Sequence, residues 1–201
     1  TSKYVRLGEM YEANGKYEDA YKCFLEGAMG ENDPKAMQKI AYMYLDDKYL
    51  SIDFEKAFRY LTLAYKTGLT VYDVINLRID FPEIRKDEKG ITRYKKFLND
   101  IYDEEIGELN IWMAEEHISG VFGTDIEKFI DYCEKAGKAG TQLGYDLLGE
   151  LYFKGVHVKR DYEKAYKYFT KSDTDKTDTK LFYLGEMYRR GLYVKKDKEK
   201  A

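Results

Sequence analysis

The chain has 201 residues, of which 35% are charged and 44% are apolar, a balance typical of a protein with an ordinary soluble core. Its net charge of −3 argues against nucleic acid as a partner, because phosphate binding usually requires a basic excess. No run of about 18 apolar residues is present, so we expect no membrane insertion. The two cysteines make no disulfide framework, which favours a cytoplasmic location. The opening Thr-Ser-Lys without a methionine indicates a fragment or a processed form.

A short motif recurs along the sequence at a constant interval. The segment DYEKA at 161–165 returns as DKEKA at 197–201, 36 residues later. Steps of the same length lead back to DIEKF at 125–129 and DFEKA at 53–57. Self-similarity at a fixed period indicates a tandem repeat protein.

A second motif precedes each of these segments. LGELY at 148–152 returns as LGEMY at 184–188 and at 7–11, and as IAYMY at 40–44. Its apolar residues are spaced i, i+3 and i+4, as on one face of a helix, and the residues after each DxEKA segment show the same spacing. Each period therefore predicts two helices, and the Asp that begins the second one is a suitable N-cap.

This pattern predicts an all-α fold, an α/α superhelical solenoid of five to six helix-turn-helix repeats of about 36 residues each. We expect one repeat domain over 1–201, with units at 1–32, 33–68, 69–104, 105–140, 141–176 and 177–201. In chain order, the first helices of the pairs are expected near 4–14, 34–46, 70–78, 105–119, 143–154 and 178–190. The second helices are expected near 17–29, 53–67, 91–101, 125–138 and 161–171, with a sixth beginning at Asp197.

Two features depart from strict repetition or constrain it. The third unit loses most of the motif residues and contains Pro82, which cannot lie inside a helix without removing a hydrogen bond, so we expect a kink or a longer loop there. Glycine recurs at one helical position, as Gly8, Gly149 and Gly185. Because glycine is costly inside a helix, its recurrence predicts that the neighbouring helix passes too close for a side chain.

The two C-terminal units, with L-G-x-x-Y, a glycine-bearing loop and D-x-x-K-A, resemble the Sel1-like repeat family, which is related to the tetratricopeptide repeats. The first unit is more similar to a tetratricopeptide repeat, and the fourth has Met113 in place of the glycine. The resemblance implies an α/α solenoid that serves as a protein-binding scaffold or adaptor, with the first helices lining a concave groove. Some secreted members carry paired cysteines in each unit; this chain lacks them, which weakens any transfer of the β-lactam hydrolysis ascribed to that branch.

By helical phase, the first helices should present eleven residues to a partner. Glutamates in this set favour a basic segment, the two arginines favour a carboxylate, and the two phenylalanines are the best anchors because they are the least stable in water. The predicted partner-binding residues are Glu9, Glu12, Tyr42, Asp146, Glu150, Phe153, Lys154, Phe182, Glu186, Arg189 and Arg190.

No residue pattern predicts catalysis, a metal site or a cofactor. His117 and His157 lack a third ligand for a metal. Cys23 and Cys133 are expected to be small buried hydrophobic residues, too far apart for a disulfide. The acidic run 173–178 lacks the glycine and the closing glutamate of a calcium loop and is interpreted as a solvated turn.

Two functions follow as hypotheses. The first is a non-catalytic scaffold that binds a peptide or protein partner along the groove formed by the first helices. The alternative is a structural or regulatory arm of a larger multidomain enzyme or signalling protein, which the truncated sixth unit suggests. The sequence leaves the oligomeric state open.

Overall fold

The computed structural model describes residues 2–75, 77–171 and 177–201, and in these ranges its regular secondary structure is entirely helical. The chain divides into two compact units, residues 1–102 and 103–201, which are described separately below. The division falls within two residues of the boundary expected between the third and fourth repeats. A single repeat domain over 1–201 stays a prediction.

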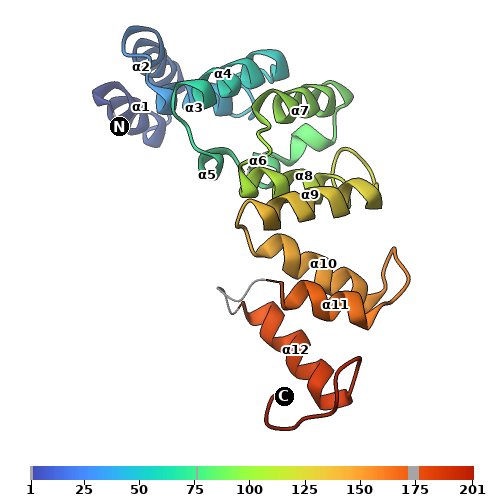
Figure 1. Ribbon diagram of the computed structural model, residues 1–201. Coiled ribbons are helices and arrows are strands. Elements are labelled where there is room, and N and C mark those ends of the chain that lie inside the picture. The colour runs from blue at the N-terminus through green and yellow to red at the C-terminus, as the bar shows by residue number, and fades with distance from the viewer. Residues whose placement is uncertain (1, 76, 172–176) are drawn as a thin grey trace. The chain divides into compact units, whose positions relative to one another are not determined.

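Unit 1 contains two complete helix pairs followed by an irregular segment (Figure 1). In each pair the two helices pack against each other, α1 against α2 and α3 against α4, and α2 also packs against α3. After the irregular segment, α7 packs against α4. The elements are α1 (Lys3–Ala13), α2 (Tyr17–Gly30), α3 (Pro34–Met43), α4 (Phe54–Thr67), α5 (Val71–Val74), α6 (Leu77–Asp80), the 3₁₀ turn η1 (Pro82–Arg85) and α7 (Glu88–Ile101).

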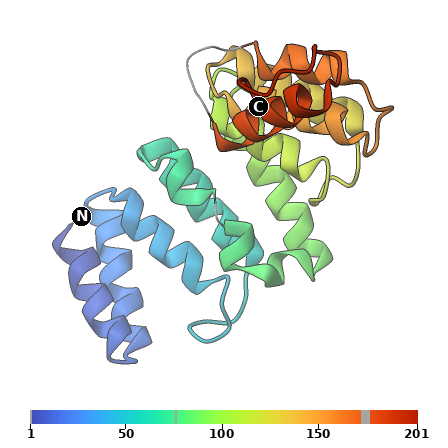
Figure 2. The ribbon, with the colours of Figure 1, turned by 90° about the horizontal axis from the view of Figure 1, so that it is seen from below.

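Unit 2 repeats the same arrangement, which can be followed from yellow-green to red in Figures 1 and 2. Helix α8 packs against α9, α10 packs against α11, and α9 and α10 join the two pairs. Helix α12 packs against α10 and α11. The elements are α8 (Gly107–Glu116), α9 (Ile126–Lys138), α10 (Leu143–Lys154), α11 (Tyr162–Phe169) and α12 (Asp178–Arg190).

The aspartates that begin the second helices act as N-caps, as predicted. In each case a carboxylate oxygen accepts a hydrogen bond from the backbone N–H three residues later, which satisfies one of the donors that a helix leaves unpaired in its first turn. The bonds run from Lys56 N to Asp53 at 3.0 Å, from Lys128 N to Asp125 at 3.1 Å and from Lys164 N to Asp161 at 2.9 Å. Lys200 N makes the same bond to Asp197 at 3.2 Å, where a turn follows in place of a helix.

The predictions of two helices are wrong. The helix expected near 70–78 is replaced by the single turns α5 and α6, and α6 ends before Phe81. Phe81 has a non-helical backbone, φ −127° and ψ 74°, because the ring of Pro82 disfavours the helical conformation at the residue before it. The sixth second helix does not form either: residues 198–200 after the Asp197 cap make only a turn, since the chain to residue 201 holds too few residues for successive i→i+4 bonds.

The recurring glycine contacts an aromatic ring of the paired helix, which confirms the predicted close approach. A Cβ built on Gly149 would lie 2.5 Å from Phe169 Cε1, and one on Gly8 would lie 2.3 Å from Phe24 Cε1. Both rings are fully buried. For Gly185, where no paired helix is present, the nearest atom is the Ala201 carbonyl oxygen at 2.8 Å.

The equivalent positions of other repeats hold different pairs of buried residues. In the second repeat Ala41 takes the place of the glycine and Leu61 that of the phenylalanine, and both have no exposed surface. In the fourth repeat Met113 and Cys133 occupy these positions, and both are buried. The larger the residue on the first helix, the smaller its counterpart on the second, as close packing requires.

Candidate interaction surface

The eleven predicted partner-binding residues lie on helices of both units. Glu9 and Glu12 lie on α1 and Tyr42 on α3, all in unit 1. The remaining eight lie on α10 and α12 in unit 2. Their contacts divide them into residues that hold neighbouring helices together and residues that are presented to solvent.

The two glutamates of α1 bind a lysine of the next first helix. Lys39 Nζ lies 3.1 Å from a Glu9 oxygen and 3.2 Å from a Glu12 oxygen. Burial acts to lower the pKa of Lys39, but the two carboxylates outweigh it and raise the pKa above its usual value. The negative charge that we expected to attract a basic segment is therefore largely neutralised within unit 1, although the Glu9 side chain is about half exposed.

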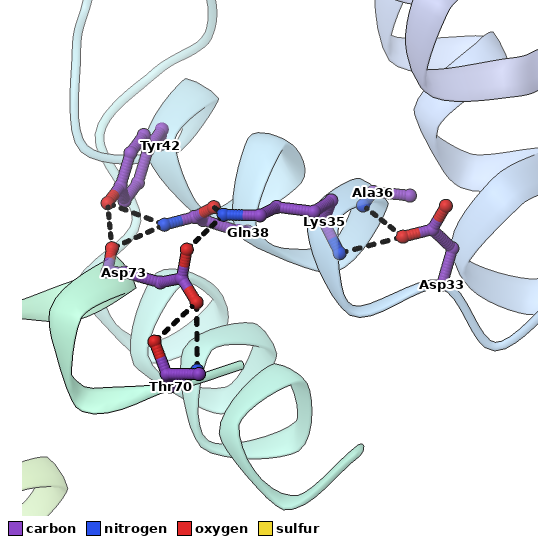
Figure 3. A network of polar contacts seen from close by, with 7 residues as sticks. All are labelled: Asp33, Lys35, Ala36, Gln38, Tyr42, Thr70 and Asp73. Carbon is purple, nitrogen blue, oxygen red and sulfur yellow. Dashed lines mark hydrogen bonds and ion pairs between the residues drawn. The ribbon is translucent and has the colours of Figure 1, made fainter. Parts of the chain in front are cut away.

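Tyr42 belongs to a polar network that connects α3 to α5 (Figure 3). Its hydroxyl accepts a hydrogen bond from Gln38 Nε2 at 2.9 Å and donates one to the Asp73 carbonyl oxygen at 3.3 Å. Gln38 Nε2 also donates to that oxygen at 2.6 Å, and Lys35 forms an ion pair with the Asp73 carboxylate. The ring packs against Phe81 with a centroid distance of 4.8 Å, and burial raises the pKa of the hydroxyl. Tyr42 thus holds the irregular third repeat, and its hydroxyl and ring are engaged within unit 1.

The two ends of this network are helix caps. The Asp73 carboxylate accepts bonds from the backbone N–H and the hydroxyl of Thr70, at 2.8 and 2.9 Å, which forms a capping box at the start of α5. The Asp33 carboxylate accepts from Lys35 N at 2.8 Å and caps α3. Because Lys35 follows one cap and pairs with the other, the start of one first helix is linked to the start of the next.

The prediction that Asp146 faces a partner is wrong, because its side chain is only 1% exposed. It accepts hydrogen bonds from the Thr177 hydroxyl, at the N-cap of α12, and from Gln142 Nε2 at 3.2 Å. Gln38 occupies the equivalent position of the second repeat and likewise contacts the next first helix. The position two residues before the Leu of the L-G-x-x-Y motif therefore faces the following repeat.

The other predicted charged residues of α10 and α12 are half-buried glutamates and exposed cations, which are paired along their own helices. Glu150 forms an ion pair with Lys154 one turn later. Glu186 accepts from Arg189 Nε and Nη2 at 2.9 and 2.7 Å and lies 3.4 Å from Arg190 Nη1. The hydrogen bond from Arg189 is the main reason why the pKa of Glu186 is lowered. The arginines that we expected to bind a carboxylate of a partner already share one of this chain.

Four rings form a continuous group, here called the α10–α12 aromatic cluster and consisting of Phe153, Tyr162, Tyr183 and Phe182. Phe153 is half-buried, with ring centroids 5.4 Å from Tyr162 and 4.8 Å from Tyr183. Tyr183 is nearly buried and also stacks on Phe169 in the core at 5.4 Å. Phe182 contacts Tyr183 edge-on at 5.1 Å and is 67% exposed. Phe182 therefore exposes a large apolar ring to water beside rings that are packed, and such exposure is energetically unfavourable.

Sequence reasoning missed two members of this cluster and one partner of the predicted charges. Tyr162 and Tyr183 support the phenylalanines, and Lys39 binds the glutamates of α1. The run Leu181-Phe182-Tyr183 gives a usable signal, because three consecutive large apolar residues cannot all face the core from one helix. No signal in the sequence pairs Lys39 with α1, since the residues are 27 to 30 positions apart.

One histidine packs among aromatic rings and the other lies in a loop between helices. His117 is buried between Phe122 and Tyr132, at centroid distances of 4.7 and 5.5 Å, and burial lowers its pKa. His157 lies in a loop with φ 65°, and Tyr193, its equivalent in the next repeat, has φ 63°. Within residues 2–75, 77–171 and 177–201, no group of three His, Cys, Asp or Glu side chains could hold a metal ion.

The remaining sequence predictions concern the cysteines and the acidic run. Both cysteines are free thiols; Cys133 is buried as predicted, whereas Cys23 is only half-buried. Residues 173–176 of the acidic run lie outside the described part of the chain, while Thr177 caps α12 and Asp178 begins it. Among the described helices, none is long and apolar enough to cross a membrane.

The comparison with protein families identifies three of the repeats. The Sel1 repeat model matches residues 34–69, 143–172 and 181–201. These three segments are Sel1 repeats. The matched segments include α3 and α4 in unit 1 and α10, α11 and most of α12 in unit 2. Sel1 repeats are in general protein–protein interaction scaffolds.

Two solved structures are similar to this chain. A Sel1 repeat protein from Oxalobacter formigenes is similar with a TM-score of 0.57 and 23% identity, over 98% of this chain and 80% of that one. A protective antigen present in uropathogenic Escherichia coli strains, described as having an SLR fold, gives a TM-score of 0.47 and 14% identity, over 98% of this chain and 51% of that one. No curated protein matches the sequence. The first similarity shows the α/α repeat fold of Sel1 proteins and nothing about a partner.

Proposed function

We propose that this Sel1 repeat chain is a non-catalytic scaffold that binds a peptide or protein surface through α10 and α12, with Phe182 as the anchor. The single observation that carries the proposal is the 67% exposure of the Phe182 ring beside Tyr183. Covering that ring removes a large apolar surface from water, which is the main source of affinity at protein interfaces.

The surroundings of Phe182 fit a polar rim around an apolar centre. Phe153 and Tyr183 form the base, and the paired charges on the same two helices are solvent-accessible. Because each carboxylate is already paired with a cation of its own helix, these charges would orient a partner of mixed charge and would not select strongly for an acidic or a basic one. The charged rim consists of Glu150, Lys154, Glu186, Arg189 and Arg190.

Unit 1 makes a smaller contribution in this proposal. Glu9 remains a candidate contact because its side chain is about half exposed beside Lys39. Tyr42 and Asp146 no longer belong to the proposed surface, since their polar atoms bind neighbouring helices. The same argument supports the absence of a catalytic role, because the polar clusters of the described residues are engaged in helix caps and helix-to-helix bonds.

The test is affinity capture from cells of the source organism, with quantitative mass spectrometry, using the full chain as bait. The bait variants are Phe182→Ala and the matched control Met10→Ala, which removes a similarly exposed apolar side chain (64% exposed) from α1. A partner retained by the unchanged chain and by Met10→Ala, and lost by Phe182→Ala, supports the proposal. Phe182→Ala is preferable to a change at Phe153, whose packing also stabilises the fold.

Direct binding then separates the anchor from the rim. The captured partner is purified and titrated against the unchanged chain, Phe182→Ala and Glu150→Ala. We expect a loss of more than about tenfold in affinity for Phe182→Ala, as for an interface hot spot, and a smaller loss for Glu150→Ala. Circular dichroism checks that each variant is folded. Equal capture by Phe182→Ala and the unchanged chain would refute the assignment of this surface.

A further inference from the structure

A groove lies between the second helices α4 and α7 of unit 1. Its volume is about 400 Å³. Phe58 and Phe97, whose ring centroids are 5.6 Å apart, are among its lining residues and are almost fully buried. Leu63 lines the groove as well and is 44% exposed. The groove therefore offers an apolar floor with an apolar residue at its edge.

The rim of this groove has an excess of positive charge. Four cations and two carboxylates line it. Both carboxylates are already paired with lining cations, Glu55 with Arg93 and Asp100 with Lys96. The other two cations, Arg59 and Lys66, lie two turns apart on α4, are exposed, and have no carboxylate at ion-pairing distance among the described residues.

A second hollow on the other side of α4 extends the same surface. It has a volume of about 490 Å³ and lies between α2 and α4. Arg59 and Leu63 line both hollows. The second one adds the methionine Met29 and the lysine Lys56, which is paired with Asp53 at 3.4 Å, and none of its described lining residues is a carboxylate. A strip of unit 1 is thus basic and partly apolar in a chain whose net charge is −3.

We infer that this strip, here called the α4 surface (Phe58, Arg59, Leu63, Lys66 and Phe97), binds an acidic peptide segment of a protein. An apolar side chain of the segment would lie over Phe58 and Phe97, and its flanking carboxylates would meet Arg59 and Lys66. Charge complementarity selects the partner, because a basic segment would be repelled by two unpaired cations. Two such cations over an apolar floor suit a peptide better than a nucleic acid backbone, which needs a longer row of phosphate contacts.

A random 12-residue peptide library displayed on phage tests this inference with the full chain as bait. Peptides enriched on the unchanged chain should be acidic and should contain at least one large apolar residue. Synthetic copies of the enriched peptides are then titrated by fluorescence anisotropy. Raising the salt concentration should weaken their binding, since the charges of Arg59 and Lys66 are exposed and screened by ions.

Charge variants locate the binding site. The double variant Arg59→Glu with Lys66→Glu should lose at least about tenfold in affinity for the enriched peptides. Its matched control is Lys3→Glu with Lys16→Glu, which makes the same change in net charge at two exposed lysines elsewhere in unit 1 and should stay within about twofold. If the charge-reversed chain is misfolded by circular dichroism, Arg59→Gln with Lys66→Gln replaces it, with a smaller expected loss.

Several results would overturn the inference. These are a failure to enrich any peptide, enrichment without an acidic bias, and full binding by the Arg59 and Lys66 variants. Equal binding after the apolar residue of the peptide is replaced by Ser would remove the role of the groove floor. Loss of peptide binding in Phe182→Ala, with binding unchanged in Arg59→Glu with Lys66→Glu, would assign the peptides to the α10–α12 aromatic cluster instead.

Discussion

The backbone N–H of Asp161 donates a hydrogen bond to the carbonyl oxygen of Tyr152, 3.0 Å away, across the turn that joins α10 to α11. The ammonium group of Lys164, three residues after Asp161, lies 4.9 Å from the centroid of the same tyrosine ring. Both contacts recur in two other repeats: Asp53 and Lys56 hold Tyr44, and Asp197 and Lys200 hold Tyr188. The D-x-x-K motif thus fixes the tyrosine of L-G-x-x-Y through its backbone and its ring.

Removing this lysine should weaken unit 2 by a small, measurable amount. Lys164→Met keeps most of the apolar stem but loses the cation over Tyr152, for which we expect a loss of about 0.5–1 kcal/mol in the free energy of unfolding. Urea unfolding followed by the fluorescence of Trp112, the single tryptophan of the chain and buried in unit 2, reports the change. Lys159→Met, at an exposed loop lysine, is the control. Equal midpoints for the two variants would contradict the prediction.

Gly149 and Phe169 should behave as a coupled pair. Gly149→Ala places a Cβ against the Phe169 ring, and we expect a loss of about 1–3 kcal/mol despite the better helix propensity of alanine. Phe169→Leu alone should also destabilise, because it leaves a cavity. The double variant reproduces the Ala41 and Leu61 pair of the second repeat, so its loss should be smaller than the sum of the two single losses. Additive losses in urea unfolding would show that the two positions are independent.

The pH dependence of unit 2 should include a contribution from Asp125. The hydrogen bond from the Lys128 backbone N–H is the largest influence on the Asp125 pKa, which is lowered. Because the folded-state pKa lies below the unfolded value of about 3.9, the stabilisation is present above that value and is lost as the pH falls through the lower folded pKa. Asp125→Asn keeps a capping acceptor but does not titrate. The stability of this variant, followed by Trp112 fluorescence, should therefore fall less between about pH 5 and about pH 2.5 than that of the unchanged chain. A loss of stability equal to that of the unchanged chain would contradict the prediction.

Asp146 and Glu150 should differ sharply although they lie one turn apart on α10. Asp146→Ala leaves the Thr177 hydroxyl and the Gln142 amide without their acceptor in a buried site, which should cost about 1–3 kcal/mol. Glu150→Ala removes only an exposed ion pair and should change the stability by less than about 0.5 kcal/mol. Hydrogen exchange at the start of α12 should become faster only in Asp146→Ala. Similar exchange rates in both variants would contradict the role of Asp146 as a buried acceptor that holds the start of α12.

The two thiols should react at different rates with a thiol reagent such as dithionitrobenzoate. Cys133 is buried and its pKa is strongly raised by burial, so it should react only when unit 2 unfolds. Cys23 is half-buried and its pKa is raised, chiefly by burial, so it should react slowly in the folded chain and faster as the pH rises. Cys23→Ser and Cys133→Ser assign the two phases. A rapid second phase in the folded chain would contradict the burial of Cys133.

Most of the helix pairs could be predicted from the sequence because each begins and ends with a local signal. The caps at Asp53, Asp125 and Asp161 depend on neighbouring backbone groups, and the motif spacing gives the partner helix. The third repeat could not be predicted in this way. Its Pro82 indicates an interruption but not its form, which depends on the network that connects Tyr42 to Asp73 across 31 residues.

The candidate surface was harder to predict than the fold. Helical phase alone places Asp146 on the same face as Glu150, and only the Thr177 cap of the next first helix shows that it is covered. The pairing of Lys39 with Glu9 and Glu12 likewise depends on how two repeats stack. Phe182 is exposed, since a large apolar residue off the apolar stripe of an amphipathic helix has no core to enter, and its role as an anchor stays a prediction.

The pairs Gly and Phe, Ala and Leu, and Met and Cys show that the sizes of two facing residues compensate within each repeat. A consensus protein built from the commonest residue at each position could combine residues from different pairs, which would leave either a cavity or a clash where the two helices cross. Repeats of this chain should therefore be transplanted as whole helix pairs, which makes the pair, and not the single helix, the natural cassette for engineering.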